Sequence, residues 1–260
     1  MAFASIDFIY DNIIGSTYGL YLMEIGNSST DEVSLGGSYD IITDRTNLSP
    51  RYNFGIIEDG VLEFDLSIMS TQPIDRNLNS TISRWLFNQR QFKKLKILDD
   101  TVEGTYYLCK LNNAQLIKIG NQIYGYKCKV VCDCGYSYEN PKKIVRVKST
   151  TPLMIPINNT SDNVDIVYPK IKLYPNKGNG IVSITNSVDG SVCNINNLVQ
   201  GEVISMDSKH KIIESDMVDL NFNRFNGVFV GLHPRVNKLT VDGDISKIEI
   251  EYQFLRSVGG

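Results

Sequence analysis

The sequence has few of the residues that carry catalytic or metal chemistry. It contains two histidines and five cysteines among 260 residues. His210 lies between two lysines in a polar turn and His233 precedes a proline in another turn, so neither is predicted to act as a general base. An odd number of cysteines, in a chain that we expect to fold in a cytosol, also argues against a disulfide framework.

The sequence motifs of several enzyme classes are missing as well. No Gly-Lys-Ser or Gly-Lys-Thr triplet and no nucleophile elbow is present. The acidic pairs Asp99-Asp100 and Asp242-Gly243-Asp244 fall in predicted turns, where exposed carboxylates are common. We therefore expect no enzymatic activity, no metal and no cofactor. A glycosidase stays open as an alternative, because its two carboxylates need not be close in the sequence.

Long apolar runs and a strong net charge are also absent. No run approaches the ~18 apolar residues of a membrane span, and residues 1–7 lack the basic start and apolar core of a signal peptide. We therefore expect synthesis and folding in a cytosol and no membrane span. The 26 basic and 29 acidic residues nearly cancel, which argues against nucleic-acid binding as the main function.

Three of the cysteines lie close together, at positions 128, 132 and 134. Their spacing differs from the two-residue gap of a zinc knuckle, and neither histidine lies near them. In a regular strand Cys128, Cys132 and Cys134 point to the same face as Tyr126 and Val130. We interpret them as small buried side chains of a core strand, with a metal site as the alternative.

Alternation of apolar and polar residues is the pattern that recurs. It runs through Leu62–Ile68 and through Ile248–Phe254, as in strands with one buried face. Near the start, the alternating segment Ile6–Tyr10, a turn and the apolar run Leu20–Met23 predict a hairpin. Further short apolar runs are Tyr106–Cys109, Ile123–Cys134, Ile181–Ile184 and Gly227–Val230. The sequence therefore predicts a mainly β protein.

One segment has helical spacing instead. Residues 79–92 contain no Gly or Pro, and apolar residues recur at helical intervals around Trp85, the chain's single tryptophan. Asn79 or Ser80 is the predicted N-cap. We interpret Trp85 as a core anchor that docks this helix on a sheet, rather than as a ligand platform.

Prolines suggest a boundary between two domains. Residues 139–157 contain three prolines, in the pairs Asn140-Pro141, Thr151-Pro152 and Ile155-Pro156. Because a proline favours extended geometry in the residue before it, we interpret this stretch as an extended connection. We expect one domain at residues 1–150, containing the helix, and a second at residues 151–260. The short strands and frequent turns of the second half favour a β-sandwich.

Several segments of the first half follow one another in a recognisable order. The chain opens with Phe8-Ile9-Tyr10-Asp11, followed by Tyr18-Gly19-Leu20. Further along, the predicted helix around Trp85 is followed by a lysine-leucine pair and then by a predicted strand. The other matching segments are Asn53-Phe54-Gly55-Ile56, Leu62–Leu66 and the glycine-aromatic strand Tyr124–Tyr136. In this order they resemble the distal tail protein family of long-tailed bacteriophages.

The second half resembles the carboxy-terminal galectin-like domain of the same family. The matching segments are Pro169–Leu173, Gly180–Asn186, Gly201–Asp207 and the turn Leu232–Leu239. In that turn Arg235 stands where glycine is common in the family, so we expect its shape to differ.

The resemblance implies a fold and a structural function. The expected fold is mainly β, with an N-terminal tail-tube-like β-barrel or sandwich domain that holds one α-helix, followed by a galectin-like β-sandwich. Six N-terminal domains would form a ring that continues the tail tube. That ring is a distal tail or baseplate hub, which joins the tail tube protein to the tail-tip hub protein and holds receptor-binding or side-fibre proteins. A contractile tail or a phage-like bacteriocin particle is a related alternative.

The resemblance also suggests where ring closure is supported. We expect Phe8, Tyr10, Tyr18 and Trp85, in the N-terminal strands and the helix, to be interface residues. DNA would only pass through the lumen, which suits a mildly acidic chain. The protein would be assembled in the host cytoplasm and would reside in the virion, at the tail tip or baseplate.

A carbohydrate-binding module for attachment to host-surface glycans is the alternative from another functional class. Such a module needs an exposed aromatic platform, and the second half offers Tyr168, Tyr174 or Phe229. Galectins stack sugar on a tryptophan, and the second half has none. A peptidase or glycosidase that acts on cell-wall material is the enzymatic alternative.

Overall fold

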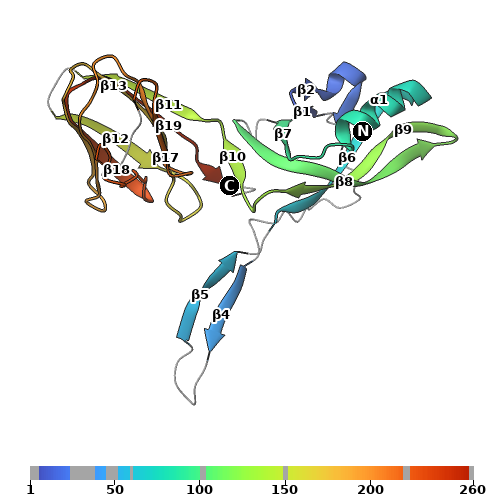
Figure 1. Cartoon of the computed structure of the whole chain (residues 1–260). Coiled ribbons are helices and arrows are strands. Elements are labelled where there is room, and N and C mark those ends of the chain that lie inside the picture. The colour runs from blue at the N-terminus through green and yellow to red at the C-terminus, as the bar shows by residue number, and fades with distance from the viewer. Residues whose placement is uncertain are drawn as a thin grey trace. The chain divides into compact units, whose positions relative to one another are not determined.

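The structure, a computed structural model, describes residues 6–23, 39–44, 52–58, 61–99, 104–148, 152–218 and 223–257. The chain forms two units, Met1–Glu139 with Arg256–Gly260, and Asn140–Leu255. It leaves the first unit after Glu139 and returns to it at Arg256. The described residues are mainly strands with one α-helix, as the sequence predicts (Figure 1).

The first unit is built on one antiparallel sheet. Its strands are β1 (Asp7–Tyr10), β2 (Ile13–Ile14), β3 (Leu20–Leu22), β6 (Glu63–Ile74), β7 (Lys93–Leu98), β8 (Thr105–Ile119), β9 (Gln122–Cys132) and β10 (Ser137–Glu139). The order is β2-β1-β7-β8-β9-β6-β3, and β10 pairs with β8 and with β20 (Leu255–Arg256). A separate hairpin is formed by β4 (Tyr39–Asp44) and β5 (Tyr52–Glu58).

The described strands of the first unit do not close into the barrel that was one of the two expected forms. The sheet ends at β2 and β3, which are only two and three residues long. A single bridge links Ile6 to Leu22, where the Leu22 N–H donates to the Ile6 carbonyl at 2.8 Å. One bridge is not a ladder, so the sheet stays open.

The N-terminal hairpin has a different partner strand from the one predicted. β1 pairs with β2 across the turn Asp11-Asn12, where both residues have positive φ, which Asp and Asn tolerate better than other side chains. A 3₁₀ turn, η1 (Gly15–Tyr18), follows and ends at Gly19 with φ of 66°. This left-handed residue redirects the chain, so β3 pairs with β6 instead. The prediction that Leu20–Met23 completes the hairpin was wrong.

The helix is confirmed, but it lies earlier in the chain than predicted. α1 spans Arg76–Leu86, and the Asp75 side chain accepts a hydrogen bond from the Leu78 N–H at 2.8 Å. Asp75 is therefore the N-cap, in place of Asn79 or Ser80. Beyond the helix, the Gln89 side chain donates to the Trp85 carbonyl at 2.8 Å and satisfies one of the last free carbonyls.

Replacing Asp75 with alanine is expected to lower the free energy of unfolding by about 1 kcal/mol, because the Leu78 N–H loses its acceptor. Urea denaturation followed by the fluorescence of Trp85 measures this change in the first unit. Ser80→Ala is the control, since Ser80 is exposed within the helix. It should not lower the midpoint, because alanine is more favourable than serine in a helix interior. Equal losses for the two variants would contradict Asp75 as the cap.

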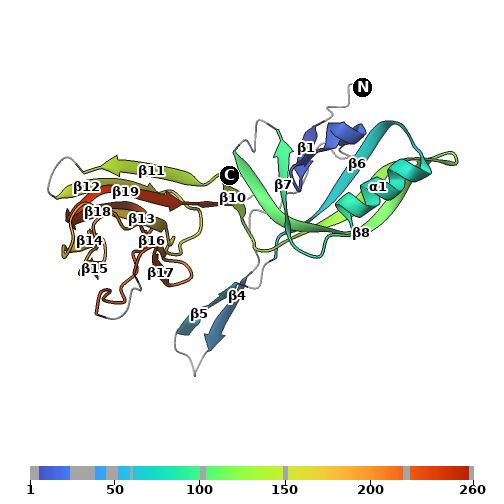
Figure 2. The same cartoon turned by 45° about the horizontal axis from the view of Figure 1, so that its top comes forward.

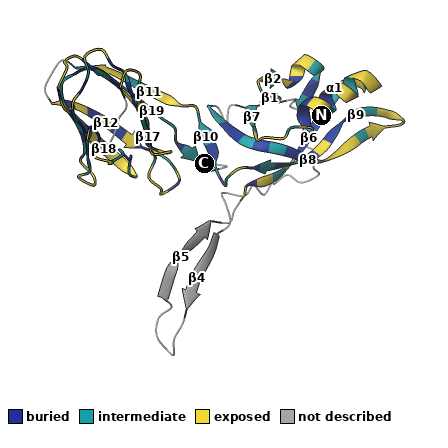
Figure 3. Ribbon diagram, in the orientation of Figure 1, coloured by how far each residue is buried: buried dark blue, intermediate teal, exposed yellow. Residues whose placement is uncertain are grey.

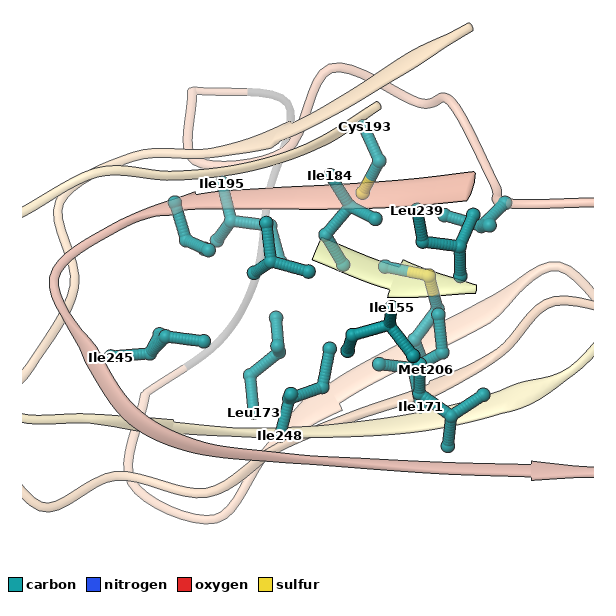
Figure 4. Packing of buried hydrophobic residues seen from close by; sticks show 14 of the residues in the cluster. Ile155, Ile171, Leu173, Ile184, Cys193, Ile195, Met206, Leu239, Ile245 and Ile248 are labelled. Carbon is teal, nitrogen blue, oxygen red and sulfur yellow. The ribbon is translucent and has the colours of Figure 1, made fainter. Parts of the chain in front are cut away.

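The second unit is a sandwich of two antiparallel sheets, as predicted for the second half. One sheet has the order β11-β19-β13-β16-β17 and the other β12-β18-β14-β15. The strands are β11 (Lys142–Val147), β12 (Leu153–Asn159), β13 (Lys170–Pro175), β14 (Val182–Asn186), β15 (Val192–Ile195), β16 (Ile204–Asp207), β17 (Ile212–Ser215), β18 (Arg235–Gly243) and β19 (Ile245–Tyr252). Isoleucine, leucine and valine from both sheets fill the space between them (Figure 4).

Two details of the second unit differ from the expectations. The unit begins at Asn140 rather than 151, because β11 pairs along its whole length with β19. Gly227–Val230 is not a strand, although Val230 is buried in the core. Burial of an apolar side chain from an irregular segment produces the same local sequence pattern as a short strand.

Candidate assembly surfaces

The four expected interface residues meet inside the first unit. Phe8 and Tyr10 lie in β1, Tyr18 ends η1, and Trp85 lies in α1. The Trp85 ring centroid lies 5.3 Å from that of Tyr18. It lies 6.0 Å from the Phe8 ring and 6.4 Å from the Tyr10 ring. The indole N–H donates to the Tyr10 carbonyl at 2.9 Å. These four side chains form an aromatic cluster, whose contacts hold β1 and η1 against α1.

The aromatic cluster belongs to the hydrophobic core. Phe8 and Tyr10 are fully buried and Trp85 is 7% exposed, which confirms Trp85 as a core anchor. Burial raises the pKa of Tyr10 well above its usual value. Gly15 permits this packing, because a Cβ there would lie 2.4 Å from the Phe8 ring. Because these rings are buried, they affect an interface only indirectly, by fixing the positions of β1, η1 and α1.

A second set of contacts holds α1 on β9. The Tyr126 hydroxyl donates to the Asn79 side chain at 2.7 Å, and the rings of Phe87 and Tyr126 are 5.4 Å apart. Figure 1 shows α1 beside β9. The exposed positions of the helix include Arg76 and Arg84, so its outer face is polar.

The outer β8 segment, Asn112–Ile119, leaves apolar side chains in solvent. Leu116 is 47% exposed and Ile119 is 58% exposed. Figure 3 shows the end of the β8–β9 hairpin largely in the colour of exposed residues. The register to β9 shifts between Asn112 and Gln115, and Asn113 has a φ of 52°. This bulge breaks the period of two, which is why the sequence predicted a strand only at Tyr106–Cys109. Leu116 and Ile119 make the outer β8 segment a candidate contact surface.

The cysteine trio is placed largely as interpreted. Cys128 and Cys132 lie in β9 and are almost completely buried. Their burial raises the pKa of both thiols to about 12. Neutral thiols are poor metal ligands, because the thiolate is the form that binds. Cys134 lies beyond the end of β9, where its thiol donates to the Tyr136 carbonyl at 3.3 Å.

Both histidines lie beside a carboxylate in a turn. His210 Nδ1 is 3.0 Å from Asp207, and His233 Nε2 is 3.0 Å from Asp189. In the part of the chain that the structure describes, no group of histidine, cysteine and acidic residues is arranged to hold a metal ion. The same residues contain no helix with the length and apolar character required to cross a bilayer.

The three aromatic residues considered as sugar platforms are engaged by neighbouring side chains. The Lys211 ammonium lies 4.1 Å from the Tyr168 ring centroid, and the Phe229 ring packs edge-on against Phe225. Tyr174 is engaged by Lys247, whose ammonium lies 3.7 Å from its ring. Each of the three rings therefore already has a neighbouring side chain against a face or an edge. The carbohydrate-binding alternative is not favoured.

A buried ion pair in the second unit escaped the sequence analysis. Arg224 Nη2 lies 2.7 Å from Glu202 Oε1, and both side chains are less than 10% exposed. The Glu202 carboxylate also accepts bonds from the Val199 N–H and the Ser215 hydroxyl, at 2.6 and 2.7 Å. No spacing rule predicts such a pair, since its members come from separate turns. The pair joins the loop before β16 to the segment before Phe225.

Structural comparison identifies the fold. The structure superimposes on the Dit protein (gp 19.1) of phage SPP1 with a TM-score of 0.70 and 12% identity, over 96% of this chain and 99% of that chain. SPP1 Dit is described as a paradigm of the hub adsorption apparatus in phages that infect Gram-positive bacteria. A chain of the activated phage p2 baseplate aligns with a TM-score of 0.49 and 11% identity, over 95% and 97% of the two chains. No curated protein sequence matches the chain.

Family comparison agrees with the fold. Residues 3–134 match a phage tail protein N-terminal domain, and residues 136–252 match a phage tail C-terminal domain. The predicted resemblance to distal tail proteins is thereby confirmed, and the protein is a structural component of a phage tail. With these two domains along nearly its whole length, the chain belongs to the phage tail protein family, and it has the fold of a distal tail protein.

Proposed function

We propose that this protein is the distal tail hub of its virion, a ring of six copies that joins the tail tube to the tail-tip or baseplate proteins. The observation that carries the proposal is the fold shared with SPP1 Dit over 96% of the chain. The protein acts by assembly and not by catalysis. It assembles in the host cytoplasm, and DNA passes through the central opening without being bound.

Ring closure requires each copy to present two different surfaces to its neighbours, because a closed ring is built from heterologous contacts. The outer β8 segment supplies one candidate surface, with exposed Leu116 and Ile119. The aromatic cluster supports closure from inside by fixing β1, η1 and α1 in place. Its four residues are therefore proposed to position the interface.

The second unit is proposed to carry the external contacts. Its two-sheet sandwich is compatible with the expected galectin-like domain. In this arrangement it faces outward and holds tail-tip, receptor-binding or side-fibre proteins. In this proposal, the boundary between the ring-forming domain and the domain that carries the external contacts lies near residues 140–150.

The mass of the purified full-length protein in solution tests the ring. Multi-angle light scattering should give about six times the 29.2 kDa of one chain, and negative-stain images should show a central hole. Leu116→Glu should lower the hexamer fraction at least tenfold at a fixed micromolar concentration, because a carboxylate would be buried at the contact.

Val188→Glu is the matched control for this variant. Val188 and Leu116 are both 47% exposed, and Val188 lies in a turn of the second unit. The control should assemble like the unmodified protein. A monomer at every concentration would contradict the ring, and equal assembly of both variants would contradict the outer β8 segment as its contact.

A further inference from the structure

Two of the five cysteines face each other across the hairpin of β8 and β9. Cys109 of β8 is the ladder partner of Cys132 of β9. Figure 2 shows β8 next to β7, its other neighbour in the sheet. Residues directly opposite in an antiparallel pair project to the same face, so both thiols enter the core, where the residues are 0% and 1% exposed. Both are free thiols in this structure, and we call them the facing pair.

The backbone hydrogen bonds show which kind of ladder position the facing pair occupies. The Asp133 N–H donates to the Leu108 carbonyl at 2.9 Å, so this bond lies beside the pair and not within it. The Cys132 N–H donates instead to the Leu62 carbonyl, on the other side of β9. Cys109 and Cys132 are therefore a non-hydrogen-bonded pair, in which the Cα atoms lie about 4.5 Å apart and the side chains are close. A disulfide requires a Cα separation of about 4.4–6.8 Å, so the backbone already has suitable spacing.

Within the described strands, no other cysteine lies opposite a cysteine. Cys128 lies opposite Leu66 of β6, and Cys193 lies opposite Ile184 in the second unit. Cys134 lies beyond the end of β9. The ladder thus selects one pair of thiols and leaves the others as internal controls.

Burial keeps the facing pair reduced while the hairpin is closed. It raises the pKa of Cys109 above its usual range, and the neighbouring Cys132 thiol raises it further. It also raises the pKa of Cys132 to about 12. The thiolate is the reactive form, so we expect either thiol to react only when local opening of the strands exposes it. Oxidation of the facing pair is therefore slow.

We propose that the facing pair is an oxidation site, at which a peroxide converts the two thiols into a disulfide that joins β8 to β9. The bond fixes the register of the hairpin just before the shift that begins at Asn112, at the base of the outer β8 segment. A reducing cytosol keeps the thiols free, whereas virion surfaces are among the places where disulfides persist. Both cysteines belong to one chain, so the bond does not depend on a ring of six.

The oxidation proceeds in two displacements. The thiolate of one cysteine attacks a peroxide oxygen and breaks the O–O bond, which gives a sulfenic acid and a hydroxide. The hydroxide takes up the proton of the second thiol and becomes water. The second thiolate attacks the sulfenic sulfur, the S–S bond forms, and the departing hydroxide takes up the proton that the first thiol had lost. The two thiols thus lose two electrons and two protons, and hydrogen peroxide is reduced to two waters.

Peptide mapping of the full-length protein after treatment with hydrogen peroxide tests the bond. The remaining thiols are blocked with N-ethylmaleimide in denaturant, and the protein is digested with trypsin without a reductant. We expect the peptide that ends at Lys110 to be joined to the peptide that begins at Val130, and dithiothreitol to separate them. The second peptide also contains Cys134, so Cys134→Ser should retain the link and Cys132→Ala should lose it.

Thermal unfolding followed by the fluorescence of Trp85 gives a second readout. The disulfide closes a loop over residues 109–132, so oxidation should raise the Tm of the first unit by about 5 °C or more, and dithiothreitol should reverse the rise. Each protein is compared with itself before and after peroxide, so a lower basal stability of a variant does not affect the result. Cys132→Ala should show no rise, whereas Cys128→Ala should show the full rise. Full labelling of the facing pair after peroxide treatment, a link through Cys134, or an unchanged Tm would each overturn this assignment.

Discussion

Replacing Trp85 with alanine should destabilise the first unit by about 3–5 kcal/mol, the usual cost of removing a buried large aromatic side chain. The indole is 7% exposed, lies against three other rings and donates to the Tyr10 carbonyl. Its loss leaves a cavity and removes a hydrogen bond between β1 and α1. Urea denaturation followed by far-ultraviolet circular dichroism is the measurement, since the variant has no tryptophan fluorescence.

Two further variants separate the contributions of the Trp85 ring and of its burial to the effect of Trp85→Ala. Trp85→Phe keeps a ring but loses the indole N–H, so its cost should be smaller than that of alanine. Phe92→Ala removes an aromatic ring that is 45% exposed and should cost less than about 1 kcal/mol. If Trp85→Ala and Phe92→Ala had similar effects, the aromatic cluster would not be the anchor of α1. Trp85→Ala should also reduce the fraction of the proposed hexamer, because β1 and η1 lose their support.

Glu202→Gln should destabilise the second unit by about 3–5 kcal/mol, because it leaves the buried Arg224 guanidinium without a countercharge. Glu202 and Arg224 are both less than 10% exposed. The amide also replaces a carboxylate oxygen that accepts from the Val199 N–H or from the Ser215 hydroxyl. The transition of the second unit, followed by circular dichroism, measures the effect.

An exposed ion pair provides the control for Glu202→Gln. Asp65 and Lys127 lie 3.2 Å apart, with side chains 63% and 53% exposed, and Asp65→Asn should cost less than about 1 kcal/mol. The double variant Glu202→Leu with Arg224→Met should recover part of the lost stability, since neither buried charge remains. A cost for Glu202→Gln as small as that for Asp65→Asn would refute the importance of the buried pair.

Strands with a regular alternation of apolar and polar residues were predictable from the sequence. Segments in which a bulge or a loop interrupts the alternation were not. β19 spans Ile245–Tyr252, within three residues of the predicted Ile248–Phe254. β6 begins one residue after the predicted start at Leu62, but it continues to Ile74, six residues beyond the predicted end. β8 was recognised only in its first part, because the bulge at Asn113 shifts the exposed positions. The segment Gly227–Val230 was misread, since an apolar run does not distinguish a strand from a buried loop.

The candidate interface residues illustrate the same limit. Their aromatic character and their place near the N-terminus and the helix were visible in the sequence, and so was the anchoring role of Trp85. That all four rings meet depends on contacts between residues about 75 positions apart, such as Trp85 with Tyr10. No local rule encodes such a contact.

By itself, the sequence determined the mainly β class, the single helix and its buried face, the buried cysteines and the family resemblance. These features follow from side-chain period, composition and the order of short motifs, all of which are local. Only the tertiary structure decided which strand pairs with β1, which side chains of β8 remain exposed, and that β11 lies at an edge of its sheet. Strand pairing and side-chain exposure depend on residues that are distant in the sequence. The same alternating pattern is compatible with a central strand and with an edge strand of a sheet, so the sequence pattern does not distinguish the two positions.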